Sequence, residues 1–360
     1  MSSVEILDVT EYVCDVIGLR ARVLHNKNDQ AVRLHLCPWS RKGIVPQLGQ
    51  IWRGKIKSKD PGGQGCLVNI GLEHPVYLQT NKNSPPEGAF VDIKIKSEQR
   101  WDKSAVVVLE TAGSSLGEQS KIGLLANSDA DPFYHGVNVI KSSNCSEAPS
   151  FVFEAIDQAL SSSFALNGGG YIHIDKTKAL IAIDVDAGSR INKGSRSNFA
   201  FSANTEALEL ICSAISLKSL GGLVVIDFLK MSAKNHNIDV QKKFQTQLNH
   251  ILGRKSQVGN ISQFGLLEAS VAHKFSPIEF VIDSLGEIEW SVINMFKLIE
   301  SEAKMNSGRF FVCQVSQDIH SWLETPTFDW KTSLIDRVGN RVEFEIDNDL
   351  SKTEYTIGMR

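Results

Sequence analysis

Residues 168–186 read Gly168-Gly-Gly-Tyr-Ile-His-Ile-Asp-Lys-Thr-Lys-Ala-Leu-Ile-Ala-Ile-Asp-Val-Asp186, and they contain two predicted strands that decide the fold. The first strand covers 171–174 and the second 179–185, and both are rich in apolar and β-branched residues. A third strand, 223–228, is apolar throughout except for Asp227. Apolar residues at helical spacing predict helices over 151–160, 204–220 and 238–252. Strands that alternate with helices in this way predict an α/β layer.

Three aspartates stand at the ends of these strands, Asp184, Asp186 and Asp227. An ionised carboxylate inside an apolar run is costly unless something compensates it. At the C-terminal edge of an open α/β sheet, however, it lies where such folds bind ligands. If the strands are neighbours, Asp184 and Asp227 come close together and repel unless a cation or a proton lies between them. The hard cations that accept carboxylate and water ligands are Mg²⁺ and Mn²⁺, and such an ion can activate water against a phosphodiester.

A less specific interpretation stays open for each of these features. The aspartates could cap helices or pair with lysine or arginine, although Asp186 adds a third oxygen donor to the pair. The triplet Gly168-Gly-Gly170 could cradle a phosphate or could simply form a loop.

Residues 48–111 contain short alternating strands separated by Gly/Pro turns, which predicts a small barrel. The surrounding segment 41–103 is basic, with 11 Lys/Arg against 6 Asp/Glu. Aromatic residues are interleaved with the basic ones, in the order Trp52, Arg53, Lys55, Lys57, Tyr77, Arg100, Trp101. Stacking aromatics and backbone-neutralising cations are the means by which barrel folds hold single-stranded nucleic acid. The alternative is that the aromatics fill a small core.

The whole chain has 360 residues, a net charge of −3 and 22% charged residues, the balance of a soluble globular protein. The α/β region covers residues 151–275. Outside it and the barrel, the sequence predicts strands over 1–47, an irregular connection over 112–150 and a small α+β domain over 276–360. No apolar run approaches the roughly 20 residues that span a bilayer, and the N-terminus lacks the features of a signal peptide. We therefore expect a cytoplasmic protein without membrane contact. The six cysteines include no CxxC pair, which argues against a zinc ribbon and a disulfide framework.

Four sequence blocks resemble the ribonuclease E/G family in order and spacing. They are the block 169–186 quoted above, Asn204-Thr-Glu-Ala207, Leu220-Gly-Gly-Leu-Val-Val-Ile-Asp-Phe228 and Ile261-Ser-Gln-Phe-Gly-Leu-Leu-Glu268. The barrel segment, with Gly49-Gln-Ile-Trp-Arg-Gly-Lys55, Cys66-Leu-Val-Asn-Ile-Gly71 and Tyr77-Leu78, is similar to that family's S1-type RNA-binding domain. Residues 292–350 resemble its C-terminal small domain more weakly.

The resemblance implies an S1-type OB-fold barrel, an RNase H-like/DNase I-like α/β catalytic region and a small C-terminal α+β domain. It places Asp184 and Asp227 on the family's two magnesium-binding aspartates, and Asp186 where an asparagine usually assists them. Leu67 and Tyr77 fall on the barrel positions where aromatics receive a base, and only Tyr77 keeps an aromatic. Lys55, expected on the same face of the barrel, is a candidate to neutralise one phosphate.

The sequence also departs from the family's pattern. The zinc-binding CxxC that links subunits is absent, so we expect no zinc, and any homo-oligomer would not use a zinc link. The sensor region for a 5′-monophosphate, here 112–150, is shortened. Gln263 replaces an arginine that faces that phosphate, and basic or polar residues are replaced at Val271-Ala-His273. Three hypotheses follow: a magnesium-dependent endoribonuclease for single-stranded RNA, a non-catalytic RNA-binding relative, and a scaffold whose C-terminal domain docks a partner.

Overall fold

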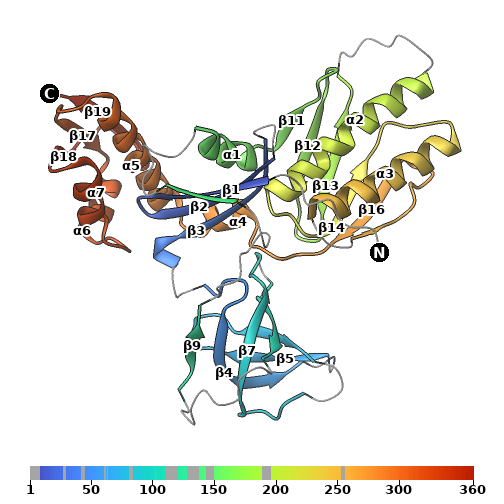
Figure 1. The fold of residues 1–360 in the computed structure, drawn as a ribbon, viewed down its shortest axis with the longest axis horizontal. Coiled ribbons are helices and arrows are strands. Elements are labelled where there is room, and N and C mark those ends of the chain that lie inside the picture. The colour runs from blue at the N-terminus through green and yellow to red at the C-terminus, as the bar shows by residue number, and fades with distance from the viewer. Residues whose placement is uncertain are drawn as a thin grey trace. The chain divides into compact units, whose positions relative to one another are not determined.

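The computed structural model describes the chain from residue 9 to residue 360 with several gaps. The described ranges are 9–26, 30–41, 45–60, 62, 64–80, 84–101, 103–110, 121–127, 138–142, 150–188, 196–252 and 256–360. They divide into two compact units. One unit comprises His25–Leu34 and Phe153–Pro277, and the other comprises Thr10–Leu24, His35–Val152 and Ile278–Arg360. Figure 1 labels the elements of both.

The first unit is built on a six-stranded sheet with the order β11-β12-β13-β14-β16-β15. Its strands are β11 (Ser163–Ala165), β12 (Tyr171–Lys176), β13 (Ile181–Asp186), β14 (Gly222–Asp227), β15 (Gln257–Val258) and β16 (Leu266–Val271). β13 and β14 are parallel, and the other neighbours are antiparallel. The helices are α1 (Ser150–Leu160), α2 (Arg196–Leu217) and α3 (Lys234–Leu252). α2 and α3 run side by side along one face of the sheet (Figure 1) and bury the unit's core there.

The second unit contains a closed barrel of five strands. They are β4 (Ile51–Lys59), β5 (Gly65–Asn69), β6 (Val76–Gln79), β7 (Phe90–Ser97) and β8 (Val106–Leu109). The order β5-β6-β8-β7-β4 closes because β4 also pairs with β5, and β9 (Gly123–Ala126) adds to β4. Alternate residues point inward, so Trp52, Val68, Leu78 and Ile93 are buried in the barrel core.

Two further sheets complete the chain. A four-stranded sheet has the order β10-β1-β2-β3, with β1 (Val9–Val16), β2 (Leu19–Asn26), β3 (Ala31–Pro38) and β10 (Asn138–Ser142). The short helix η1 (Trp39–Arg41) follows β3, and the short helix α4 (Ile278–Asp283) precedes the C-terminal region. In the C-terminal region, α5 (Glu287–Met305), α6 (Gln317–Glu324) and α7 (Trp330–Val338) share a core with the sheet β18-β17-β19. Its strands are β17 (Phe311–Val315), β18 (Val342–Ile346) and β19 (Tyr355–Met359).

The predicted fold class is confirmed: an OB-type barrel, an α/β region and a small C-terminal α+β region are all present. The helices α4, α6 and α7 were not predicted, nor were β9 and β10 within the segment expected to be irregular. These strands have only four and five residues, too few to produce a periodic signal. No helix in the described ranges is long and apolar enough to cross a membrane.

Four of the five cysteines in the described ranges are buried in the core, and the fifth, Cys37, is half-buried. Burial raises the pKa of the Cys14, Cys212 and Cys313 thiols to about 12, and Cys66 is also buried. Cys145 lies outside the described residues. Thiols of this kind are poor nucleophiles at neutral pH.

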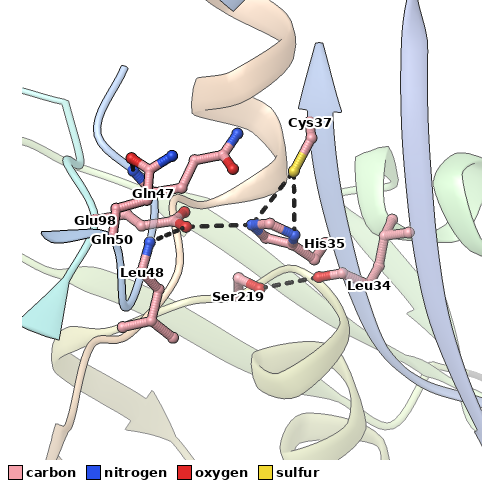
Figure 2. Close-up of polar contacts among 8 residues, drawn as sticks. All are labelled: Leu34, His35, Cys37, Gln47, Leu48, Gln50, Glu98 and Ser219. Carbon is pink, nitrogen blue, oxygen red and sulfur yellow. Dashed lines mark hydrogen bonds and ion pairs between the residues drawn. The ribbon is translucent and has the colours of Figure 1, made fainter. Parts of the chain in front are cut away.

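A buried charged pair joins β3 to the segment that follows β7 (Figure 2). The His35 Nε2 atom lies 3.3 Å from Glu98 Oε1, which also accepts a hydrogen bond from the Leu48 backbone N–H at 3.1 Å. Cys37 Sγ lies 3.4 Å from His35 Nδ1 and 3.9 Å from Nε2. Because these two distances are similar, the sulfur lies over the ring rather than in line with an N–H bond, which is not the geometry of a catalytic Cys–His pair.

We expect this pair to make stability depend on pH. Burial alone lowers the pKa of His35, but the neighbouring Cys37 and Glu98 together raise it well above its usual value of 6.5. The stabilisation is therefore fully present below about pH 6.5 and is lost as the pH rises through the higher pKa of the folded state. Urea unfolding at a series of pH values should show this decline, and Glu98→Gln should flatten it. An equally steep decline in Glu98→Gln would assign the pH dependence to another group.

Candidate active site

The ends of β13 and β14 bring two of the predicted aspartates together. Asp184 and Asp227 are direct register partners on these parallel strands. Neighbouring strands lie about 4.8 Å apart and paired residues point to the same face, so the two carboxylates share one patch at the C-terminal edge of the sheet. The two strands are therefore neighbours, as the sequence indicated.

The apolar sequence around these aspartates does not bury them. Asp184, Asp186 and Asp227 are exposed, whereas the alternating residues Ile183, Val185 and Ile226 are buried. The reason is that α2 and α3 cover only one face of the sheet (Figure 1). The alternation of buried and exposed residues along β13 and β14 places the aspartates on the other face.

The alternative roles for the pair find no support in the described part of the chain. There, neither Asp184 nor Asp227 caps a helix or forms an ion pair. Nor do three or more His, Cys, Asp or Glu side chains converge as a metal cage among the described residues. Two exposed carboxylates therefore lie side by side with like charge, an arrangement that a bound cation would stabilise.

Asp186 has a local structural partner. Its Oδ1 accepts a hydrogen bond from the Gly188 backbone N–H at 2.8 Å, which closes the turn after β13. The glycine triplet packs against this turn: Gly170 has φ +90°, and a Cβ there would lie 2.2 Å from the Asp186 carbonyl oxygen. Gly170 thus allows two backbone segments to approach closely, which a residue with a Cβ would prevent.

Asn204 holds the loop that follows Asp227. It is fully buried on α2, its Nδ2 donates to the Leu229 carbonyl at 2.8 Å, and its Oδ1 accepts from the Leu229 N–H at 3.1 Å. One amide therefore satisfies both backbone groups two residues beyond the aspartate. Asn204 belongs to one of the four sequence blocks, and no role was predicted for it. Its helical spacing with Ala207, Leu208 and Ile211 indicated that it faces the core, but not which group it contacts.

His173 and Tyr171 extend the exposed face on β12, and sequence reasoning gave neither a role. His173 is the register partner of Asp184, and Tyr171 is that of Asp186. The two rings stack with centroids 5.9 Å apart, and Ser163 Oγ lies 2.8 Å from His173 Nδ1. The sequence signal that could have identified them is the period-two spacing along β12, which places residues 171, 173 and 175 on the face of the aspartates.

The barrel presents the three predicted RNA-binding residues on its outer surface. Lys55 is exposed with its Nζ 5.6 Å from the centre of the Phe90 ring, and Leu67 is the register partner of Tyr77. Leu67 and Tyr77 are half-buried and alternate with the core residues Val68 and Leu78. The Tyr77 hydroxyl donates to Asp60 Oδ2 at 3.2 Å, and partial burial together with this carboxylate raises the pKa of Tyr77.

The other aromatic and basic residues of the barrel segment have three different environments. Trp52 is in the core, as the alternative interpretation expected. Arg53 forms a bidentate ion pair with Asp92, at 2.7 and 2.8 Å, so its charge is already matched. Lys55 and Lys57 instead border an open groove of about 280 Å³, together with Asn69 and Glu73.

The segment that carries the aspartate pair matches a known protein family. The sequence profile of the Ribonuclease E/G family matches residues 136–272, which include Asp184 and Asp227. Over this segment the chain is similar to the ribonuclease E/G family. The resemblance inferred from the four sequence blocks is therefore confirmed.

Individual members of the ribonuclease E/G family also align with part of the chain. Ribonuclease E of Buchnera aphidicola (subsp. Acyrthosiphon pisum) is 33% identical over 174 residues, covering 44% of this chain and 19% of that protein. Ribonuclease E of Escherichia coli K12 is 31% identical over 201 residues, covering 50% and 17%. Ribonuclease G of the same strain is 30% identical over 127 residues, covering 35% and 26%. The aligned part of the chain thus spans about a sixth to a quarter of the length of these relatives.

Proposed function

We propose that this chain is a metal-dependent endoribonuclease that hydrolyses phosphodiester bonds in single-stranded RNA in the cytoplasm. The observation that carries the proposal is the Asp184–Asp227 register pair at the C-terminal edge of a ribonuclease E/G α/β sheet. The names of the relatives, ribonuclease E and ribonuclease G, supply the substrate class.

The donor set suits Mg²⁺ in particular. Mg²⁺ retains several of its waters and is usually bound by one or two carboxylates together with substrate phosphate, rather than by a cage of protein ligands. Two adjacent exposed carboxylates, with no third ligand converging on them among the described residues, match that preference. When bound, the ion would activate water and stabilise charge on the phosphodiester. Mn²⁺ has the same ligand preferences and is the alternative cation.

The chain's own residues perform the positioning. Asp184 and Asp227 hold their carboxylates at a fixed spacing because both belong to hydrogen-bonded strands. Asn204 fixes the backbone of Leu229, two residues after Asp227. The packing of Gly170 against Asp186 fixes the end of the strand that carries Asp184. Preorganisation of this kind is the main protein contribution to phosphoryl chemistry.

The test is cleavage of an end-labelled single-stranded RNA by the whole chain, with Mg²⁺ and with excess chelator. Cleavage that requires the cation and starts within the strand supports the proposal. RNA binding without cleavage under any condition would instead support the rival, an RNA-binding relative that has lost catalysis. Two features favour this rival: Asp186 in place of the family's usual asparagine, and the missing cations, such as the arginine replaced by Gln263. If the first is the cause, Asp186→Asn should restore activity.

The barrel residues should contribute to RNA affinity rather than to the chemical step. We expect Tyr77→Ala to weaken binding about tenfold at every salt concentration, because base stacking is worth about 1–3 kcal/mol. Lys55→Ala should reduce the slope of log affinity against log salt by about one, the loss of one phosphate contact. Fluorescence anisotropy with a labelled RNA measures both effects.

Two variants serve as controls for this prediction. Tyr77→Phe keeps the ring and removes only the hydrogen bond to Asp60, so it should bind nearly as the parent does. Lys331, like Lys55, lies over an aromatic ring, with its Nζ 5.5 Å from the centre of Trp330, but it belongs to α7. Lys331→Ala should leave the salt slope unchanged. Parental binding by Tyr77→Ala and Lys55→Ala would show that the barrel is not the RNA site.

A further inference from the structure

Phe264 is the most exposed large apolar side chain in the described part of the chain, at 77%. It lies in the turn that leads into β16, in the same unit as the aspartate pair. A single exposed apolar residue is ordinary on a protein surface. Its significance therefore depends on how the ring is held and on what lies beside it.

The turn that presents Phe264 is closed by its own hydrogen bonds. The Ser262 N–H donates to the Leu266 carbonyl at 2.8 Å, and the Gly265 N–H donates to the Ser262 carbonyl at 3.1 Å. Ser262 Oγ accepts from the N–H groups of Phe264 and Leu266, both at 3.3 Å. The backbone under the ring is thus ordered in advance, which lowers the entropy lost when a ligand contacts it.

The same turn borders the carboxylate pair. Leu266 is the register partner of Asp227, and the Phe228 N–H donates to the Gly265 carbonyl at 3.4 Å. Gly265 has φ +95°, and a Cβ at this position would lie only 3.8 Å from Asp227 Oδ1. The exposed ring therefore belongs to the residue next to the one that faces the catalytic carboxylate.

We propose that Phe264 is a stacking site for an unpaired nucleobase adjacent to the phosphodiester at the Asp184–Asp227 site. The inference rests on the proposed function and adds a base-binding position within the α/β unit, separate from the barrel. An exposed ring on a rigid turn offers a flat apolar face, every nucleobase has a matching π face, and stacking tolerates any sequence. Such a contact binds the RNA strand by stacking and needs no positive charge on the protein. The neighbouring residue Gln263 is exposed and uncharged, so it supplies no ion pair to a phosphate.

The test uses short single-stranded RNAs that carry 2-aminopurine at each position in turn, because stacking on an aromatic ring quenches its emission. Binding is measured with Mg²⁺ in the Asp227→Asn background, which keeps the RNA intact. We expect quenching at one position or at two adjacent positions. Phe264→Leu, which keeps apolar volume but has no π face, should abolish that quenching, and Phe264→Trp should keep it. Phe264→Ala should weaken RNA affinity about tenfold.

Met305→Ala is the matched control, since Met305 is 68% exposed and belongs to the other unit. It should change neither quenching nor affinity. Unchanged quenching in Phe264→Leu, or no RNA binding at all, would overturn the stacking site. So would a change in oligomeric state on Phe264→Leu, which would assign the ring to a contact between protein chains. If quenching depends on Phe264 but the parent never cleaves RNA, the stacking site stands and the proposed catalysis fails.

Discussion

Asp227→Asn should abolish RNA cleavage while leaving the fold intact. The substitution removes one of two negative ligands and changes the side-chain volume little. The carboxylate is exposed and has no hydrogen-bond partner within the described residues, so the free energy of unfolding should hardly change. Bound cations contribute several kcal/mol to transition-state charge stabilisation. We therefore expect a loss of about a thousandfold or more, equivalent to about 4 kcal/mol, measured as single-turnover cleavage of a labelled RNA.

Thermal melting gives this variant a second readout. Mg²⁺ should raise the melting temperature of the parent, because a ligand that binds only the folded state stabilises it, and should have no such effect on Asp227→Asn. Without the cation, the variant should melt at the parent's temperature or slightly higher, since the like-charge contact with Asp184 is gone.

Asp175→Asn is the matched control for the charge itself. Asp175 is an exposed carboxylate on the same face of the same sheet, but its register partner is Ala182 rather than another acid. This variant should retain both cleavage and the Mg²⁺-dependent rise in melting temperature. Full activity in Asp227→Asn, or in the parent with excess chelator, would rule out a metal held by this pair.

The position of the aspartate pair could be predicted, whereas its exposure could not. Strand neighbourhood follows from two apolar runs of similar length, each ending in an acid and separated by a helix. Which face of a strand is covered depends on helices that are remote in sequence, here α2 and α3. The apolar residue Val225 and the acid Asp227 share the uncovered face, so local hydrophobicity gave the wrong burial.

The barrel illustrates the same limit. Alternation along β4 and β6 predicts that Trp52 and Tyr77 each lie on one face, but not which face is inside. Closure of the barrel places Trp52 in the core and Tyr77 outside, so one aromatic fits the core interpretation and the other remains available to stack on a base. Asn204 could not be interpreted from sequence for a related reason. Its role depends on a hydrogen bond to Leu229, 25 residues along the chain.

Gly170→Ala should destabilise the α/β unit strongly and remove activity with it. A Cβ at this position would lie 2.2 Å from the Asp186 carbonyl oxygen, 2.7 Å from Ala187 C and 2.9 Å from Ala187 Cα. All three are backbone atoms at the end of β13, so no side chain can move aside to relieve the clash. A positive φ adds about 1–2 kcal/mol for any residue with a Cβ. We therefore expect a loss of more than about 3 kcal/mol in the free energy of unfolding, the range of severe backbone incompatibility.

Gly308→Ala separates the clash from the strain. Gly308 has φ +82°, close to the +90° of Gly170, but a Cβ there would meet nothing within 4 Å. This control should cost only the backbone strain, about 1–2 kcal/mol, and should leave RNA cleavage at the parental rate. Urea unfolding and single-turnover cleavage of the two variants measure both quantities. If Gly170→Ala unfolds like Gly308→Ala and still cleaves RNA, the close approach of the glycine turn to β13 is not what positions Asp184 and Asp186.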